Sequence, residues 1–271
     1  MIVDFDSITS ASNPLIKQLR SLERKKGRNE TGLFLAECSS CVEQALARDW
    51  QIYTLIVSKT SADRDFVQDL AKRARDKGAR VVSVPDRLAG SSARKDNPQA
   101  VIAAIKHSDL ELSALNPGAP GLWIGLYECR DPGNLGTILR TADCAGAAGV
   151  ILLENCCDPF SVEAVRASMG SLFDVALART DFATFNAWRQ TAGLNMVAAS
   201  VNGESAPTEI DFTKPSLLLM GNEQAGLPAE IEAACDQLCL IPMRGGADSL
   251  NLAQATAIML YEGWRQRGFV S

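Results

Sequence analysis

Through its N-terminal part, the chain alternates short apolar runs with amphipathic stretches, which predicts strands and helices in turn. Leu15, Leu19 and Leu22 recur at helical spacing, and Asn13 followed by Pro14 favours a helix start just before them. Two further amphipathic stretches predict helices over 41–49 and 62–78. A short strand is predicted at 33–37, and three β-rich runs at 52–58, 80–85 and 99–105 predict the strands of one sheet. The pattern therefore indicates a small α/β unit.

A break in the pattern follows at residues 108–120, where proline and glycine occur without hydrophobic periodicity, and we interpret this stretch as a linker. Beyond it, apolar runs predict strands at 122–127, 149–154, 195–200, 216–221 and 237–243, with a shorter one near Val175. Helices are predicted at 133–146, 161–170, 181–193 and 228–236, with a final one after Asn251. Strands that are apolar throughout indicate a parallel sheet with both faces covered. In such sheets, ligands bind at the carboxyl ends of the strands.

Three of these strands end in loops that are rich in glycine and polar side chains. The first loop carries Asn134, with Arg140 six residues further on, and the second carries Gly221 and Glu223. The third runs from two glycines into residues 249–251, where the final helix begins. Together the loops offer backbone N–H donors, a guanidinium and a carboxylate, without a catalytic histidine. The glycine fingerprints of dinucleotide and nucleoside-triphosphate sites are absent from the chain.

Each of these features also has a simple structural interpretation. Asn134 suits an N-cap, Gly221 suits a turn, and Asp248 or Ser249 suits the cap of the final helix. Taken singly, the features favour that interpretation, and only their combination points to a binding site.

The three segments resemble, in order and spacing, the three motifs of the SpoU (TrmH-like) RNA 2′-O-ribose methyltransferases of the SPOUT superfamily. They read DPGNLGTILRTADCAG, LLLMGNEQAGLP and LIPMRGGADSLNLAQATAIMLYE. Residues 13–37 resemble the substrate-binding domain that precedes the catalytic domain in many members. The resemblance implies an N-terminal RNA substrate-binding domain (1–107), a linker (108–120) and a SpoU-type catalytic domain (121–271). The implied N-terminal domain is a smaller, ribosomal-protein-like α/β domain, and the implied catalytic domain is a parallel-sheet α/β domain with a deep trefoil knot.

The same resemblance implies a cofactor and a set of site residues. The cofactor is S-adenosylmethionine, and its expected contacts, carried over by position, are Met220, Gly221, Ile241, Met243 and Leu250. The expected catalytic positions are Asn134, Arg140, Glu223, Ser249 and Asn251. The family also implies a homodimer built across the site.

An arginine is an awkward catalytic base, because its guanidinium stays protonated in proteins. A neighbouring phosphate and a dry site would let Arg140 accept a proton transiently. Alternatively, Arg140 hydrogen-bonds the developing alkoxide and the adjacent phosphate while a water takes the proton, which we favour. A purely structural role, in an ion pair with Asp143 or Glu223, remains a third interpretation.

The net charge of −5 and the pI near 5.1 do not by themselves indicate a nucleic-acid partner. A basic cluster nevertheless lies between Pro14 and Glu30, and it is either a solvated helix face or a phosphate contact. The resemblance favours RNA contact, for which we select Lys17, Arg20, Arg24, Lys25 and Arg28. Ribosomal RNA is the expected substrate, otherwise transfer RNA.

Two other functions stay open at this point. The first is a non-catalytic RNA-binding or ribosome-assembly protein that retains the fold, and the second is a different enzyme on a doubly wound sheet. Intact polar positions in the three motifs count against the first, and the absent glycine fingerprints count against the second.

The eight cysteines predict reduced thiols in a cytoplasmic protein. No apolar run reaches the length of a membrane span, and the first residues lack the basic start of a signal peptide. Cys38 and Cys41 form a C-x-x-C pair, but there is no second pair, and the single histidine, His107, is far away in sequence. We therefore expect no metal. The pairs 156–157 and 235–239 suit buried apolar positions.

Overall fold

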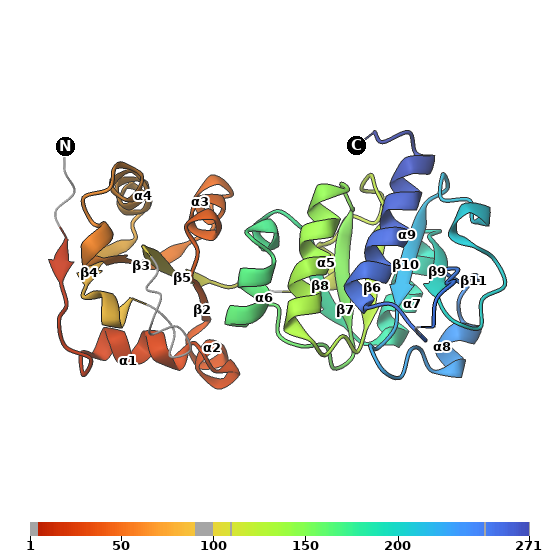
Figure 1. The fold of residues 1–271 in the computed structure, drawn as a ribbon, viewed down its shortest axis with the longest axis horizontal. Coiled ribbons are helices and arrows are strands. Elements are labelled where there is room, and N and C mark those ends of the chain that lie inside the picture. Colours follow the sequence, from red (N-terminus) through yellow and green to blue (C-terminus); the bar gives the residue numbers. More distant parts are fainter. Residues whose placement is uncertain (1–4, 90–99, 109, 247, 271) are drawn as a thin grey trace. The chain divides into compact units, whose positions relative to one another are not determined.

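The computed structural model describes residues 5–89, 100–108, 110–246 and 248–270, and its contacts divide the chain into two compact units (Figure 1). The first unit contains Met1–Ser108 and Asp158–Asp174, and the second contains Asp109–Cys157 and Val175–Ser271. Residue 99, which begins one predicted strand, lies outside the described residues.

The first unit is built on a mixed sheet with strand order β1-β4-β3-β5-β2. Its strands are β1 (Asp6–Ser7), β2 (Leu33–Ala36), β3 (Ile52–Ser58), β4 (Arg80–Val84) and β5 (Val101–Lys106). Strand β5 runs antiparallel to both of its neighbours. The helices from the N-terminal part of the chain are α1 (Pro14–Ser21), α2 (Lys25–Thr31), α3 (Ser39–Ala47) and α4 (Asp65–Asp76). The predicted small α/β unit is confirmed.

Helix α1 begins as its sequence predicts. The side chain of Asn13 accepts a hydrogen bond from the backbone N–H of Leu15 at 2.9 Å, so it caps the free end of the helix. Leu15, Leu19 and Leu22 are buried in the core under the sheet. The chain then turns after α1 and starts α2 at Lys25.

A segment from the C-terminal half of the sequence completes the first unit. Residues 158–174, which include α6 (Val162–Ala167), pack with the N-terminal strands and helices. Phe34 of β2 contacts the rings of Phe160 and Phe173, and the indole of Trp50 donates to the carbonyl of Phe173 at 3.3 Å. The helix itself is predicted from sequence, but its packing with the first unit is not. The division at 107 and 121 rests on sequence order alone and stays a prediction.

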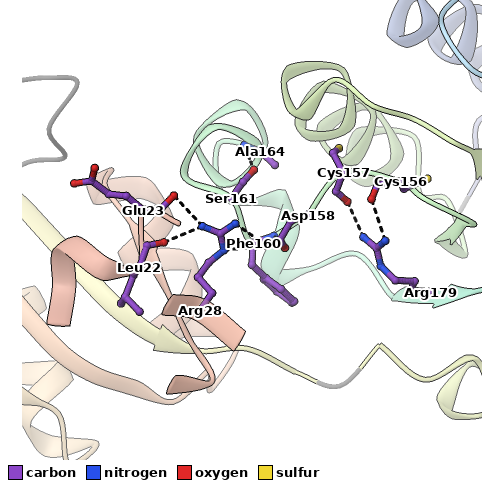
Figure 2. A network of polar contacts seen from close by, with 10 residues as sticks. All are labelled: Leu22, Glu23, Arg28, Cys156, Cys157, Asp158, Phe160, Ser161, Ala164 and Arg179. Atoms are coloured by element: carbon purple, nitrogen blue, oxygen red, sulfur yellow. Dashed lines mark hydrogen bonds and ion pairs between the residues drawn. The ribbon is translucent and has the colours of Figure 1, made fainter. Parts of the chain in front are cut away.

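Arg28 ties this segment to α2 from a buried position, as Figure 2 shows. Its guanidinium donates to Asp158 Oδ2 at 2.9 and 2.6 Å, and to the carbonyls of Leu22 and Glu23 at 2.8 and 3.2 Å. Its side chain is 5% exposed. The expectation that Arg28 contacts RNA is therefore wrong, because its donors are already bonded inside the unit.

The expectation of reduced thiols also needs a correction. Cys38 and Cys41 form a disulfide across the first turn of α3, which places their Cα atoms 5.2 Å apart. One helical turn brings residues three apart onto the same side, so this disulfide is local and links no distant parts of the chain. The cysteines at 129, 144, 156, 157, 235 and 239 carry free thiols.

The second unit is built on a parallel sheet with strand order β11-β9-β10-β6-β7-β8. The strands are β6 (Trp123–Tyr127), β7 (Gly149–Leu153), β8 (Leu177–Thr180), β9 (Asn195–Ala199), β10 (Ser216–Met220) and β11 (Gln237–Cys239). The helices are α5 (Pro132–Cys144), α7 (Phe182–Thr191), α8 (Ala229–Ala233) and α9 (Leu252–Gln266). The predicted parallel-sheet α/β fold is confirmed.

Helices cover both faces of this sheet. Helices α5 and α9 pack against each other, and they contact β7 and β10 respectively (Figure 1). Phe185 of α7 and Ile231 of α8 join the core on one face, where Ile151 and Leu153 point the same way because they are two residues apart. Among the described residues, no helix is both long enough and apolar enough to cross a bilayer.

Removing the Arg28 side chain tests its structural role. Arg28→Ala leaves Asp158 without its cation in a largely buried place, so we expect the free energy of unfolding to fall by about 3 kcal/mol. Urea denaturation of the whole chain measures this. The matched control is Lys26→Ala, whose exposed pair with Glu30 is worth less than about 1 kcal/mol. Equal losses in the two variants would contradict the assignment.

Candidate active site

The three loops that the sequence singles out meet at the carboxyl edge of the second sheet. They follow β6, β10 and β11, and hydrogen bonds join all three. The first contact is between Glu223 after β10 and the backbone after β6. The second is between Asn134 at the start of α5 and Asn251 at the start of α9. The loops therefore form one constellation.

Glu223 is the acceptor at the centre of this constellation. Its Oε1 accepts from Asn134 Nδ2 at 3.3 Å and from the N–H of Asp131 at 3.2 Å, and its Oε2 accepts from the N–H of Arg130 at 3.2 Å. Partial burial raises the pKa of the Glu223 carboxyl, but hydrogen bonds from backbone N–H groups and from Asn134 outweigh it and lower the pKa below its ordinary value. The group is therefore a carboxylate at neutral pH.

The two asparagines connect the helix starts. Asn251 Nδ2 donates to Asn134 Oδ1 at 2.9 Å, and Asn134 Nδ2 in turn donates to Glu223 Oε1. Asn251 is also the N-cap of α9, since its Oδ1 accepts from the N–H of Ala253 at 2.9 Å. Asp131 caps α5 by accepting from the N–H of Asn134 at 2.7 Å. The N-cap interpretations are thus wrong, because Asp131 and Asn251 cap these helices in place of Asn134, Asp248 and Ser249.

A cavity of about 290 Å³ opens beside this constellation. It is lined by the loop after β10, by the segment after β11, by the start of α9 and by the end of β9. All five predicted cofactor contacts line it, namely Met220, Gly221, Ile241, Met243 and Leu250. Ser249 and Glu223 line it too. The placement agrees with the expected role of these residues, which stays a prediction.

Residues 199–201, at the carboxyl end of β9, also line the cavity and were not predicted. A signal was present, because the polar residue Ser200 directly follows β9. The order of the strands in the sheet could not be predicted from the sequence. Because β9 lies between β10 and β11, its carboxyl end lies beside theirs.

Arg140 lies on α5, outside the residues that line the cavity. Six residues of helix carry it about 9 Å along the axis from Asn134. Its side chain is exposed, and it forms no ion pair within the described part of the chain. An ion pair with Glu223, one of the structural interpretations, is therefore not found, and the guanidinium faces solvent.

Gly221 allows the loop after β10 to close tightly. Asn222 and Gly226 exchange backbone hydrogen bonds at 2.9 and 3.0 Å, and a Cβ on Gly221 would lie 2.5 Å from the carbonyl carbon of Gly226. Gly226 itself adopts a φ of +66°, which favours glycine. Both glycines are required by the backbone, so that cavity wall is built from main chain.

The cavity suits a ligand that is part apolar and part polar. Its size is at the lower end of small-molecule pockets, and its lining combines methionine and leucine residues with polar ones such as Glu223 and Ser249. These surroundings fit the adenine and the amino-acid part of S-adenosylmethionine. Within the described ranges, no group of three or more histidine, cysteine, aspartate or glutamate side chains is arranged to hold a metal.

Known protein families match both parts of the chain. Residues 121–261 match the SpoU rRNA Methylase family, and residues 13–103 match the MRM3-like substrate binding domain. Among curated relatives, the 23S rRNA (uridine(2479)-2′-O)-methyltransferase of Streptomyces viridochromogenes is 30% identical, covering 91% of this chain and 87% of its own. The 23S rRNA (guanosine(2553)-2′-O)-methyltransferase RlmP of Bacillus subtilis is 30% identical, covering 94% and 97%.

A solved structure is more similar still. The AdoMet-bound rRNA methyltransferase from Sinorhizobium meliloti is 41% identical, with a TM-score of 0.89, over 98% of this chain and 99% of that one. That protein carries the cofactor that the three motifs predict for this cavity.

Gly221→Ala tests the main-chain wall of the cavity. The added methyl group collides with backbone atoms of Gly226, so we expect the affinity for S-adenosylmethionine to fall about tenfold or more, as overpacking of this kind typically costs. Isothermal titration calorimetry measures the affinity. Gly245→Ala is the matched control, because a Cβ there meets nothing within 4 Å, and it should bind as the unaltered protein does. Unchanged binding by Gly221→Ala would refute the tight-loop argument.

Proposed function

Because the chain belongs to the SpoU rRNA methylase family, we propose that its cavity binds S-adenosylmethionine beside a ribose 2′-hydroxyl of ribosomal RNA. The protein is an S-adenosylmethionine-dependent RNA 2′-O-ribose methyltransferase. The observation that carries the proposed site is the hydrogen-bonded union of three loops at the rim of one cavity.

The cofactor supplies an electrophilic methyl group, so the protein has to align the ribose oxygen and remove its proton. Arg140 is suited to the first task, because its fork can donate to a phosphate and to the developing alkoxide together. It keeps its own proton, as guanidinium groups do, and a water takes the proton of the hydroxyl. The solvent-facing side chain is free to meet RNA in this way.

Glu223 acts as a positioning residue in this scheme. Its oxygens already accept from two backbone N–H groups and from Asn134, and its lowered pKa makes it a weak base. Because the pKa is lowered on folding, the stabilisation that the carboxylate gives is present above the ordinary pKa and is lost as pH falls through the lowered value. At neutral pH, Glu223 therefore holds the starts of both helices, through Asn134 and Asn251.

RNA is proposed to bind through the N-terminal domain, for which the match to a substrate binding domain is the support. With Arg28 excluded as an RNA contact, the proposed contacts are the exposed basic residues in and between α1 and α2, namely Lys17, Arg20, Arg24 and Lys25. We further propose that two copies form a homodimer, that the strands of the second unit carry the family's knot, and that the protein acts in the cytoplasm without a metal. Relatives named as 23S rRNA methyltransferases favour ribosomal over transfer RNA.

Arg140→Ala tests the reaction. We expect methyl transfer to fall by about a hundredfold or more, because the charge that stabilises the alkoxide is lost, while the affinity for S-adenosylmethionine is unchanged. Transfer of a labelled methyl group to total RNA gives the rate, and calorimetry gives the affinity. Arg140→Lys keeps the charge without the fork and should recover only part of the rate.

The matched control is Arg265→Ala on α9, where the arginine is already paired with Glu262. It should transfer at the unaltered rate. Full transfer by Arg140→Ala would exclude the proposed role of that side chain. An unaltered protein that binds RNA without ever consuming the cofactor would instead favour the non-catalytic RNA-binding alternative.

Lys25→Ala tests the route of RNA. Each phosphate contact adds to the salt dependence of binding, so the slope of log K against log salt should become shallower by about one. Filter binding with a ribosomal RNA fragment, over a range of potassium chloride concentrations, measures the slope. Lys72→Ala on α4, also exposed but outside the basic cluster, should leave it unchanged. Identical slopes in both variants would remove α2 from the RNA-binding surface.

A further inference from the structure

Two free cysteines lie on adjacent, backbone-bonded chain segments at the edge of the site, in a place that the methyl-transfer scheme does not use. Cys129 follows β6 and Cys157 follows β7, and these strands are neighbours in the sheet. The N–H of Cys157 donates to the carbonyl of Cys129 at 2.8 Å. Chain segments joined in this way lie about 4.8 Å apart, which is within the span of about 4.4–6.8 Å that a disulfide bridges.

Cys129 is the buried member of the pair and touches the central carboxylate. Its thiol donates to Glu223 Oε1 at 3.5 Å and to the carbonyl of Asp131 at 3.8 Å, and the Cys157 thiol is a further neighbour. The hydrogen bond to Cys157, together with burial, raises the pKa of the Cys129 thiol. Its proton therefore stays on the sulfur, in reach of both partners.

Cys157 is the accessible member and has the character of a nucleophile. It is half-buried, and the hydrogen bond from Cys129 lowers the pKa of its thiol, with a further contribution from the nearby Arg179. Figure 2 shows Arg179 of β8 donating to the carbonyls of Cys156 and Cys157, at 3.0 and 2.6 Å. These two bonds hold the segment with Cys157 in place.

Cys156 is adjacent in sequence but is arranged differently. Its thiol donates to the carbonyls of Leu126 and Leu153 at 3.1 and 3.3 Å, and burial raises its pKa to about 11. It is thus turned into the sheet and stays protonated. Cys157 instead combines partial access to solvent with a nearby cation.

We propose that Cys129 and Cys157 form a redox-sensitive pair, which a hydroperoxide oxidises to a disulfide and which thereby slows methyl transfer. The control of transfer rests on the proposed function, whereas formation of the disulfide does not. In the reduced protein, the Cys129 proton supports Glu223, which holds the loop after β6 and Asn134. In the oxidised protein that proton is gone, and the sulfur is turned towards Cys157.

The chemistry balances with hydrogen peroxide as the oxidant. The Cys157 thiolate attacks one peroxide oxygen, the O–O bond breaks, and the products are a sulfenic acid and, after protonation, water. The Cys129 sulfur then attacks the Cys157 sulfur, the S–O bond breaks, and a second water leaves with the Cys129 proton. Two thiols are oxidised to one disulfide, and one peroxide is reduced to two waters.

The test uses the whole chain, treated with hydrogen peroxide and then with or without dithiothreitol. After alkylation and trypsin digestion, mass spectrometry should find peptide 107–130 linked to peptide 141–166, and dithiothreitol should remove the link. Methyl transfer should fall about tenfold or more on oxidation, as expected for the loss of a hydrogen bond to a charged group, and should recover on reduction.

Two variants identify the cysteines. In the presence of peroxide, Cys157→Ser should form no link and should transfer methyl groups as fast as the untreated, reduced protein. Cys144→Ser removes an exposed thiol of α5, and its transfer should still slow on treatment with peroxide. Absence of the link, or a link with unchanged transfer, would overturn the proposal. If the reduced protein transfers no methyl group, the proposed function fails. The redox proposal is then tested separately: a disulfide link that changes the affinity for S-adenosylmethionine on oxidation supports it, and the absence of either contradicts it.

Discussion

The site depends on one carboxylate that is surrounded by donors. Glu223 comes from the loop after β10, yet its partners come from the loop after β6 and from the start of α5, and Asn251 of α9 is bonded to the same asparagine. A carboxylate in this position joins loops that are about ninety residues apart in sequence. Without it, backbone N–H groups at Arg130 and Asp131 would lose their acceptor, and the cavity would lose one of its edges.

Much of this arrangement could be predicted, because the end of each apolar run in the sequence marks the end of a strand. Apolar runs that stop at a polar residue or a glycine mark where a loop begins, and parallel strands bring their carboxyl ends to one edge. That logic, with the resemblance of the motifs, located the cavity lining from Met220 to Leu250. It did not identify the caps, since Asp131, Asn134, Ser249 and Asn251 are all residue types that favour N-caps, and only the folded backbone selects Asp131 and Asn251.

Two of the errors share a physical cause, which is pairing over long sequence distances. Arg28 sits in a basic run that looks solvated, and its partner Asp158 is 130 residues further on. Nothing near Arg28 in the sequence announces that acid. The segment that carries Asp158 is likewise a helix by its local pattern, and only the aromatic contacts of Phe160 and Phe173 with Phe34 show which unit it packs with. Local pattern specifies elements, whereas partners are specified by the assembled core.

The saturation of Glu223 also narrows the chemistry. A general base needs a free lone pair directed at the proton that it takes, and a pKa near the working pH. Glu223 has neither, because its oxygens are occupied and its pKa is lowered. Arg140 cannot easily lose a proton, although it is exposed and unpaired within the described ranges. Neither group is then a conventional base. The division of labour that fits both is a carboxylate that orders the loops, a guanidinium that steadies the oxygen, and a solvent molecule that accepts the proton.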